Sequence, residues 1–167
     1  MFEDKISQRI VPLPAFIFPV LEICYYFGLN LCLSIDSVPI KTACILFVIP
    51  LRKFYEQNLL AIFIIMVMVF SAVSGGSIRL TKFVRFNIIQ AILFDIGLTC
   101  VGQIYTLCPL EFRESFLIRN LIINPFALGV LFVILYCCIL ILLGRYPKFP
   151  IFTDAARLHT LSGRLDI

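Results

Sequence analysis

The chain has 167 residues, of which 61% are hydrophobic and 14% are charged, and its mean hydropathy is +1.04. Soluble domains carry about 25% charged residues, and their helices have one apolar and one polar face. The composition therefore excludes a water-soluble domain and predicts an integral membrane protein. The net charge of +4 arises from 14 basic and 10 acidic residues that are dispersed along the chain, which argues against a nucleic-acid partner.

Four long apolar segments divide the chain. A bilayer core about 30 Å thick requires about 20 apolar residues per helix, so this length allows roughly four crossings in one membrane domain, 1–167, without an appended soluble domain. Pro12, Pro14 and Pro19 crowd the beginning of the first segment. We expect its regular helix to start after Pro14, and Pro19 to kink it or to lie in its first turn. The expected spans are residues 13–35, 58–74, 83–108 and 120–143.

A shorter apolar segment, 38–51, precedes the second span. It contains Lys41 and is followed by Arg52 and Lys53. Its 14 residues would form a helix of about 21 Å, which is too short for the hydrocarbon core, so we interpret it as an interfacial or re-entrant segment. The predicted fold class is all-α: a polytopic integral membrane protein with four transmembrane helices plus this short segment.

The distribution of basic residues predicts the orientation. On the side of the two termini lie nine of them: Lys5, Arg9, Arg79, Lys82, Arg85, Arg145, Lys148, Arg157 and Arg164. On the other side lie five: Lys41, Arg52, Lys53, Arg113 and Arg119. A fifth span at 38–51 would change the split to eight against six. The positive-inside rule thus favours four spans, with both termini and the tail 144–167 in the cytosol-equivalent compartment.

Two ionisable residues lie at membrane depth, Glu22 and Asp95. Such groups cost about 2.5 to 3.5 kcal/mol even on the lenient insertion scale, so they are kept where something satisfies or uses them. Asn87, Gln90 and Asp95 fall within an arc of about 140° on the third helix, and Thr99 extends this polar stripe. The stripe predicts a conduit lining or an interhelical contact. Packing is the favoured interpretation for the two amides, and a protonated carboxyl bonded across helices is the alternative for the two acids.

Three basic residues just before the third span, Arg79, Lys82 and Arg85, are expected to anchor it at the membrane edge. The sequence predicts no catalytic residues, no metal site and no cofactor. The only histidine is His159, and no metalloprotease, serine-hydrolase or Walker motif is present. The seven cysteines lie in or beside apolar runs without a paired motif, so we expect them to be buried apolar residues rather than a zinc site or a disulfide framework: Cys24, Cys32, Cys44, Cys100, Cys108, Cys137 and Cys138.

Three stretches carry a resemblance to a known family. The first is residues 85–96, with the sequence RFNIIQAILFDI. The others are PVLE at 19–22, followed by Tyr26 and Gly28, and GRYP at 144–147, followed by Pro150 and DAA at 154–156. In this order and spacing the chain resembles the twenty-kilodalton Tic family of chloroplast inner-envelope protein-import components over about residues 10–160. The short N-terminus lacks the long, Ser- and Arg-rich character of a transit peptide, which fits a plastid-encoded algal type.

The resemblance implies a four-helix protein of the plastid inner envelope with both termini in the stroma. It implies a translocon that imports precursor proteins, with other Tic subunits and the Toc complex as partners besides membrane lipids. We hypothesise that Glu22, Asn87, Gln90 and Asp95 form a hydrated seam for an unfolded chain, whose backbone polar groups cannot lie against lipid. The alternatives are a small-solute channel or transporter, and a purely structural subunit that assembles the translocon.

Overall fold

The computed structural model describes residue 6, residues 8–75 and residues 80–147. Within these residues the chain forms helices and no strand, so the all-α prediction is confirmed. In chain order the elements are a 3-10 helix at Leu13–Phe16, α2 (Ile17–Tyr26), α3 (Gly28–Leu33), α4 (Val38–Ser74), α5 (Lys82–Leu107), α6 (Leu110–Glu114), α7 (Phe116–Ile118), a π-helical turn at Arg119–Ile123 and α8 (Asn124–Leu142).

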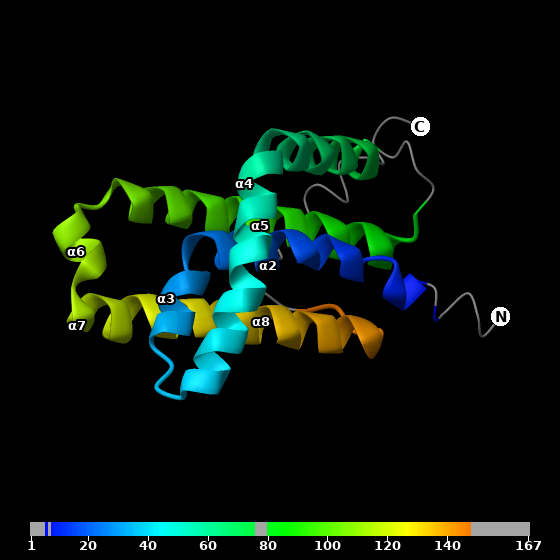
Figure 1. Ribbon diagram of the computed structural model, residues 1–167. Coiled ribbons are helices and arrows are strands. Elements are labelled where there is room, and N and C mark those ends of the chain that lie inside the picture. The colour runs from blue at the N-terminus through cyan, green and yellow to red at the C-terminus, as the bar shows by residue number, and fades with distance from the viewer. Residues whose placement is uncertain (1–5, 7, 76–79, 148–167) are drawn as a thin grey trace.

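Four helical segments of the described chain are long and apolar enough to cross a membrane: Gln8–Tyr26, Val38–Ser74, Lys82–Leu107 and Phe116–Leu142. The prediction of four transmembrane helices is thereby confirmed. In Figure 1, α2, α5, α8 and the last part of α4 run along a common direction. The beginning of the first segment and the end of the last lie at the same end of this bundle, where Arg9 Nη1 donates a hydrogen bond to the Leu142 carbonyl at 3.2 Å.

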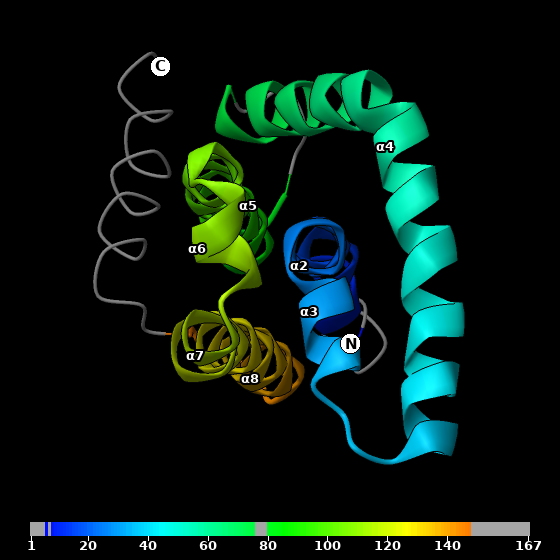
Figure 2. The ribbon, with the colours of Figure 1, turned by 60° about the vertical axis from the view of Figure 1, so that its left-hand side comes forward.

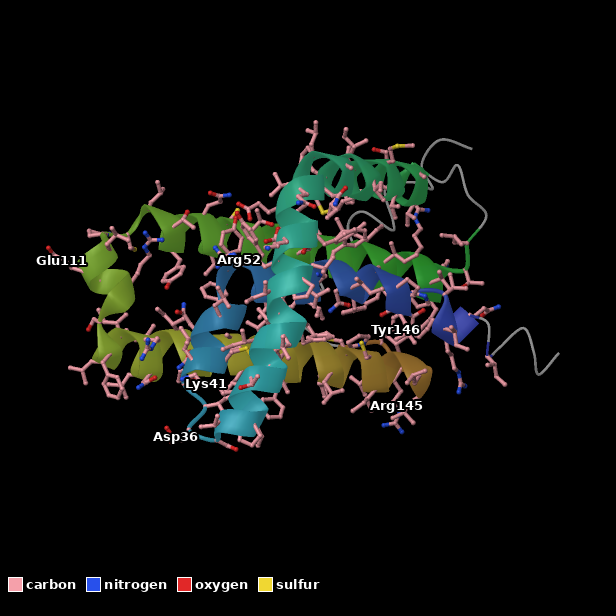
Figure 3. All side chains as sticks on the ribbon, in the orientation of Figure 1. Asp36, Lys41, Arg52, Glu111, Arg145 and Tyr146 are labelled. Atoms are coloured by element: carbon pink, nitrogen blue, oxygen red, sulfur yellow. A yellow bond between two sulfur atoms is a disulfide. The ribbon has the colours of Figure 1, made fainter. Side chains whose placement is uncertain are left out.

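Helix α4 differs from the sequence prediction, which separated a short segment, 38–51, from a span at 58–74. The structure joins both in one helix of 37 residues with Pro50 inside it. The intervening Arg52, Lys53, Glu56 and Gln57 are good helix formers, so nothing there stops the helix. The helix is bent: its first part, which carries Lys41 and Arg52, crosses the bundle, and its last part runs along it (Figure 3). Figure 2 shows that the two parts enclose α2 on two sides.

The ends of the helices follow from local sequence. Pro19 occupies the first turn of α2, where its missing N–H leaves no hydrogen bond unmade. The Thr81 side chain accepts from the Val84 amide at the start of α5. Gly144 has a φ of 72° and ends α8 in a Schellman motif, in which its own amide bonds Ile141 O at 2.9 Å and the next amide bonds Leu140 O at 2.8 Å.

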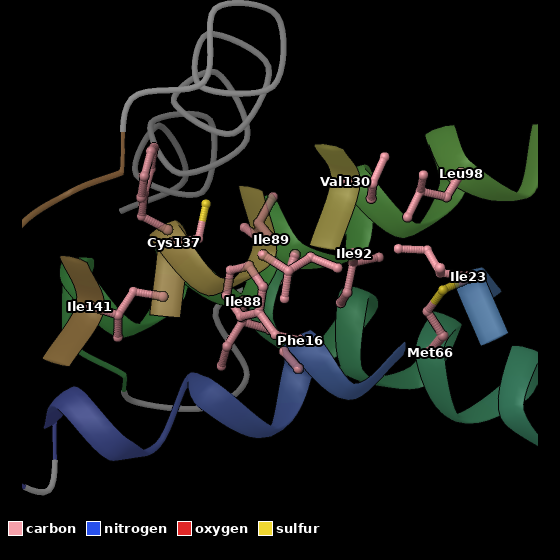
Figure 4. Packing of buried hydrophobic residues seen from close by; sticks show 14 of the residues in the cluster. Phe16, Ile23, Met66, Ile88, Ile89, Ile92, Leu98, Val130, Cys137 and Ile141 are labelled. Carbon is pink, nitrogen blue, oxygen red and sulfur yellow. The ribbon is translucent and has the colours of Figure 1, made fainter. Parts of the chain in front are cut away.

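The core lies where α2, α5 and α8 meet, as Figure 4 shows for Phe16, Ile23, Ile89, Ile92 and Ile141. Helix α5 is the centre of the bundle, because 44% of its most apolar 18-residue stretch is buried, compared with 11% of that of α4. Helix α4 therefore directs most of its apolar side chains outward. In a bilayer these side chains face lipid or a partner subunit.

A disulfide joins Cys32 of α3 to Cys44 of α4. The expectation that all seven cysteines are unpaired is therefore wrong for these two. The chain reverses direction between α3 and α4, and this turn brings the two Cα atoms to 5.6 Å. Sequence spacing gave no sign of the pair, since neither cysteine belongs to a recognisable paired motif. The bond fixes the first part of α4 to α3.

Candidate functional site

A cavity of about 200 Å³ lies between α2, α4 and α5, at the depth of the spanning helices. Its polar lining comes from all three helices, and its apolar lining comes mainly from α4. The lining residues are Glu22, Tyr26, Tyr55, Leu59, Ile62, Phe63, Met66, Asp95, Ile96, Thr99, Cys100 and Gln103. Both carboxyl residues that the sequence singled out by their membrane depth therefore line the same cavity.

Glu22 is the centre of the polar contacts. Its side chain is 3% exposed, and its Oε1 atom accepts a hydrogen bond from the Tyr55 hydroxyl of α4. The Thr99 hydroxyl of α5 lies 2.7 Å from the same oxygen and 3.0 Å from the Asp95 carbonyl oxygen. Because a hydroxyl has one proton, Thr99 donates to one of these acceptors at a time. Glu22 thus links three helices through a single carboxyl oxygen.

Two carboxyl oxygens at the cavity have no hydrogen-bond partner among the described residues. They are Glu22 Oε2 and Asp95 Oδ1, and the Asp95 side chain is 4% exposed. No basic residue is among the described lining residues. A buried acceptor without a partner is costly, so these oxygens favour water or a ligand that donates hydrogen bonds.

The close approach of α2 and α5 depends on a glycine. A Cβ atom at Gly102 would lie 2.3 Å from the ring of Tyr26, so only glycine leaves room for this ring. The Tyr26 hydroxyl accepts a hydrogen bond from Gln103 Nε2 at 2.8 Å. Farther from the cavity, Asn30 Nδ2 of α3 donates to the Tyr105 hydroxyl of α5 at 2.9 Å. Polar contacts therefore continue from the cavity toward the end of the bundle that lies away from the termini.

The two amides of the predicted stripe lie elsewhere. Asn87 is fully buried and donates through Nδ2 to the Phe83 carbonyl of its own helix at 2.8 Å. Gln90 is 3% exposed, and its Nε2 lies 3.5 Å from the Pro147 carbonyl oxygen beyond α8. Neither residue lines the cavity. The structure thus brings Asp95 to Glu22 and places the amides in separate packing environments.

The three predicted membrane-edge anchors have different surroundings. Arg85 Nη2 donates a hydrogen bond to the Ser74 carbonyl at the end of α4, which ties the two ends of the α4–α5 connection together. Lys82 is exposed at the first residue of α5. Arg79 lies outside the described residues, as do His159 and the DAA part of the C-terminal motif.

Sequence reasoning missed Tyr55 and Gln103. Tyr55 is 6% exposed, and its ring packs against Tyr25 at a centroid distance of 5.1 Å. Tyr55 falls between the predicted segments 38–51 and 58–74, so the sequence did not place it inside a spanning helix. In the continuous helix α4, Tyr55 lies seven residues after Val48, on the same buried face.

These features define a class of protein: a polytopic helical membrane protein with a cavity between its spans that has mainly apolar walls and contains buried carboxyl groups. Within the described part of the chain, no group of His, Cys, Asp and Glu side chains could hold a metal ion. The cavity contains carboxyl, hydroxyl and amide groups that can exchange hydrogen bonds with a polar guest.

Comparison with known proteins gives the family. The protein-family model described as "Chloroplast import apparatus Tic20-like" matches residues 9–156. A "Tic20 family protein" of Synechocystis sp. is 32% identical over 143 residues, which cover 84% of this chain and 85% of that protein. The "Tic20 family protein Ycf60" of Cyanidium caldarium is 26% identical over 161 residues, covering 95% and 76% of the two chains. That of Porphyra purpurea is 26% identical over 161 residues, covering 94% and 77%.

The chain therefore belongs to the Tic20 family, and the resemblance found in the sequence is confirmed. No solved structure matches the chain. Membership suggests a role in chloroplast protein import, in a complex with other subunits and in a plastid membrane. The family consists of translocon components and is not a known family of enzymes.

Proposed function

We propose that this protein is a subunit of the protein translocon of the plastid inner envelope, and that the cavity between α2, α4 and α5 forms part of the path of the imported chain. The observation that carries the proposal is a pair of buried carboxyl oxygens in the spanning helices, on Glu22 and Asp95, that meet no hydrogen-bond donor in the described part of the chain. These two oxygens line the cavity, whereas the other buried side-chain oxygens that lack a partner among the described residues, on Asn87, Gln90 and Asn124, lie away from it. A surface that meets a moving polypeptide must keep hydrogen-bonding capacity free for it.

The position of the cavity supports this role. Phe63 of α4 and Ile96 of α5 line it and are 56% and 43% exposed, so the cavity reaches the outer surface of the bundle between these helices. Four helices of this length cannot enclose a polypeptide by themselves, and the described bundle is filled by its own core. The proposed path therefore runs along the α4–α5 side of the subunit, and other translocon subunits or further copies complete it.

We propose that both termini face the stroma. The nine-to-five distribution of Lys and Arg supports this orientation. A second, independent argument comes from the Cys32–Cys44 disulfide, which joins α3 to the first part of α4, away from the end of the bundle at which the first span begins and α8 ends (Figure 1). Disulfides persist where the thioredoxin and glutathione systems do not reduce them, so the α3–α4 turn belongs on the intermembrane side. The first part of α4 would then lie in the interface on that side, with Toc components beyond it.

Replacing Asp95 with leucine tests the proposal. Asp95→Leu removes the carboxyl group from the cavity wall and replaces it with an apolar side chain of similar length. The expected result is reduced precursor import with the translocon complex still assembled. Asn124→Leu is the matched control, because Asn124 is 7% exposed, donates to the Asn120 side chain four residues earlier and is not among the residues that line the cavity. Unchanged import and assembly in Asp95→Leu would refute the conduit role and leave the carboxyl a packing group.

The same variants distinguish the other two functions. A purely structural subunit predicts that Asp95→Leu lowers complex assembly and import together, without any contact between the cavity and cargo. A small-solute channel predicts solute flux through reconstituted vesicles that hold this chain and no precursor, and loss of that flux in Asp95→Leu.

A further inference from the structure

The cavity combines free acceptor oxygens with apolar walls. Its unpartnered polar atoms are carboxyl oxygens of side chains that are 3% and 4% exposed, Glu22 and Asp95. A ligand that supplies several N–H donors would satisfy both, whereas a ligand rich in acceptors would add to the unpaired oxygens. The chemistry of the cavity therefore selects for a donor, and for positive charge where the carboxyls are ionised.

The apolar walls of the cavity further restrict the kind of ligand that it can bind. Leu59, Ile62 and Met66 of α4 face the carboxyls of α2 and α5 across the cavity. At about 200 Å³ the space is several times the roughly 30 Å³ share of one water molecule, so it exceeds what a bare ion fills. A lysine or arginine side chain has this mixed character, because it has an apolar stem and a charged, donor-rich head.

We propose that the cavity receives the basic side chains, arginine above all, of the polypeptide that passes between α4 and α5. This inference rests on the proposed function and names the feature of the cargo that the site recognises. A guanidinium carries five N–H donors in a planar fork, which is more than the two that Glu22 Oε2 and Asp95 Oδ1 require. Chloroplast-targeting segments are rich in Arg and Ser and poor in acids, so they offer this group repeatedly and bring few carboxylates that the cavity would repel.

Cys100 provides a reporter inside the site. It lines the cavity, it is exposed, and its thiol is not in a disulfide. The full chain is reconstituted in proteoliposomes with the other four free cysteines replaced by alanine. Cys100 is then modified with a methanethiosulfonate that carries a trimethylammonium group or with one that carries a sulfonate group. Both reagents attack the same thiolate, so the ratio of their rates depends on the charge that the cavity prefers.

We expect the cationic reagent to react about tenfold faster than the anionic one, after each rate is divided by that of a reference cysteine at Leu107, which is 84% exposed at the end of α5. The preference should disappear in Glu22→Gln/Asp95→Asn, which keeps the shape of both side chains. Asp95→Asn alone is the second variant, because Asp95 Oδ1 has no hydrogen-bond partner among the described residues, and it should lose part of the preference. Equal rates for the two charges, or no reaction with either reagent, would overturn the proposal.

A second experiment, with an arrested precursor protein, distinguishes failure of this proposal from failure of the proposed function. A photo-crosslinking amino acid at Ile96 is used in plastids with a precursor arrested in mid-import, whose arginines near the site are kept or changed to glutamine. We expect the crosslink yield to fall severalfold when the arginines are removed. A strong crosslink that does not depend on arginine would overturn recognition of basic side chains and leave the conduit role standing. Loss of every precursor crosslink at Ile96 would instead refute the conduit role and, with it, this proposal.

Discussion

The hydrogen bonds of Glu22 predict a stability effect that can be measured on the purified protein. Tyr55→Phe removes the hydroxyl that donates to Glu22 Oε1, and it changes little else because the ring can keep its place. Interhelical hydrogen bonds in membrane proteins contribute about 0.6 kcal/mol on average and about 1.7 kcal/mol at most. Both partners are buried, at 6% and 3% exposure, so a loss of about 1 kcal/mol is expected, which is roughly a fivefold change in the unfolding equilibrium.

Glu22 Oε1 has a second hydroxyl donor, Thr99 of α5, so a double variant tests the same carboxyl group. Thr99→Val removes the hydroxyl that lies 2.7 Å from the same oxygen. In either single variant Glu22 Oε1 keeps one donor, whereas in Tyr55→Phe/Thr99→Val the whole carboxyl is buried without any. The cost of an unsatisfied buried acceptor then adds to the two lost bonds, so the double variant should lose about 3 kcal/mol, more than the sum of the single variants.

The assay is unfolding of the full chain in bicelles by titration with sodium dodecyl sulfate. Tyr136→Phe is the matched control, because Tyr136 is 52% exposed on α8 and should change stability by less than about 0.5 kcal/mol. A loss in Tyr55→Phe no larger than that in Tyr136→Phe would refute the reasoning. The reasoning would also be refuted if Tyr55→Phe/Thr99→Val were as stable as the less stable of the two single variants, because Glu22 would then have other partners.

Two further predictions concern the framework around the cavity. Gly102→Ala places a methyl group 2.3 Å from the Tyr26 ring and should cost about 1 to 3 kcal/mol in the same titration. At Gly129 the new Cβ would have no atom of another described element within 4 Å, so Gly129→Ala should be close to neutral. Equal effects would contradict the close packing of α2 on α5. In the oxidised, detergent-denatured chain, maleimide-polyethylene glycol should label five cysteines, and seven after reduction of the Cys32–Cys44 bond; seven labels without reductant would refute the disulfide.

The sequence was sufficient for those features that depend on the bilayer alone. The cost of a charge in hydrocarbon identified Glu22 and Asp95 without knowledge of any neighbour. The end of α8 is likewise a local feature, because glycine at position 144 can take the positive φ that the helix terminus requires.

Features that depend on long-range packing could not be predicted. Glu22 meets Thr99 only because α2 lies against α5, and the helical period that placed Asn87 and Asp95 on one stripe does not say which neighbour each one meets. The continuity of α4 was hidden by Pro50 and by the charged residues that follow it. That error also concealed Tyr55, which lies in the joined part of α4 and donates to Glu22. The approach of Cys32 to Cys44 depends on the reversal of the chain between α3 and α4, which the spacing of the cysteines does not show.

The central claim is that the α4–α5 side of the subunit meets the imported polypeptide. The most direct test places the photo-crosslinker at Ile96, which is 43% exposed at the rim of the cavity, and at Phe132, which is 70% exposed on α8, and arrests a precursor in mid-import. The account predicts a precursor crosslink from Ile96 and none, or far less, from Phe132. Crosslinks from Ile96 to neighbouring membrane subunits alone would contradict it and make this protein a structural member of the complex.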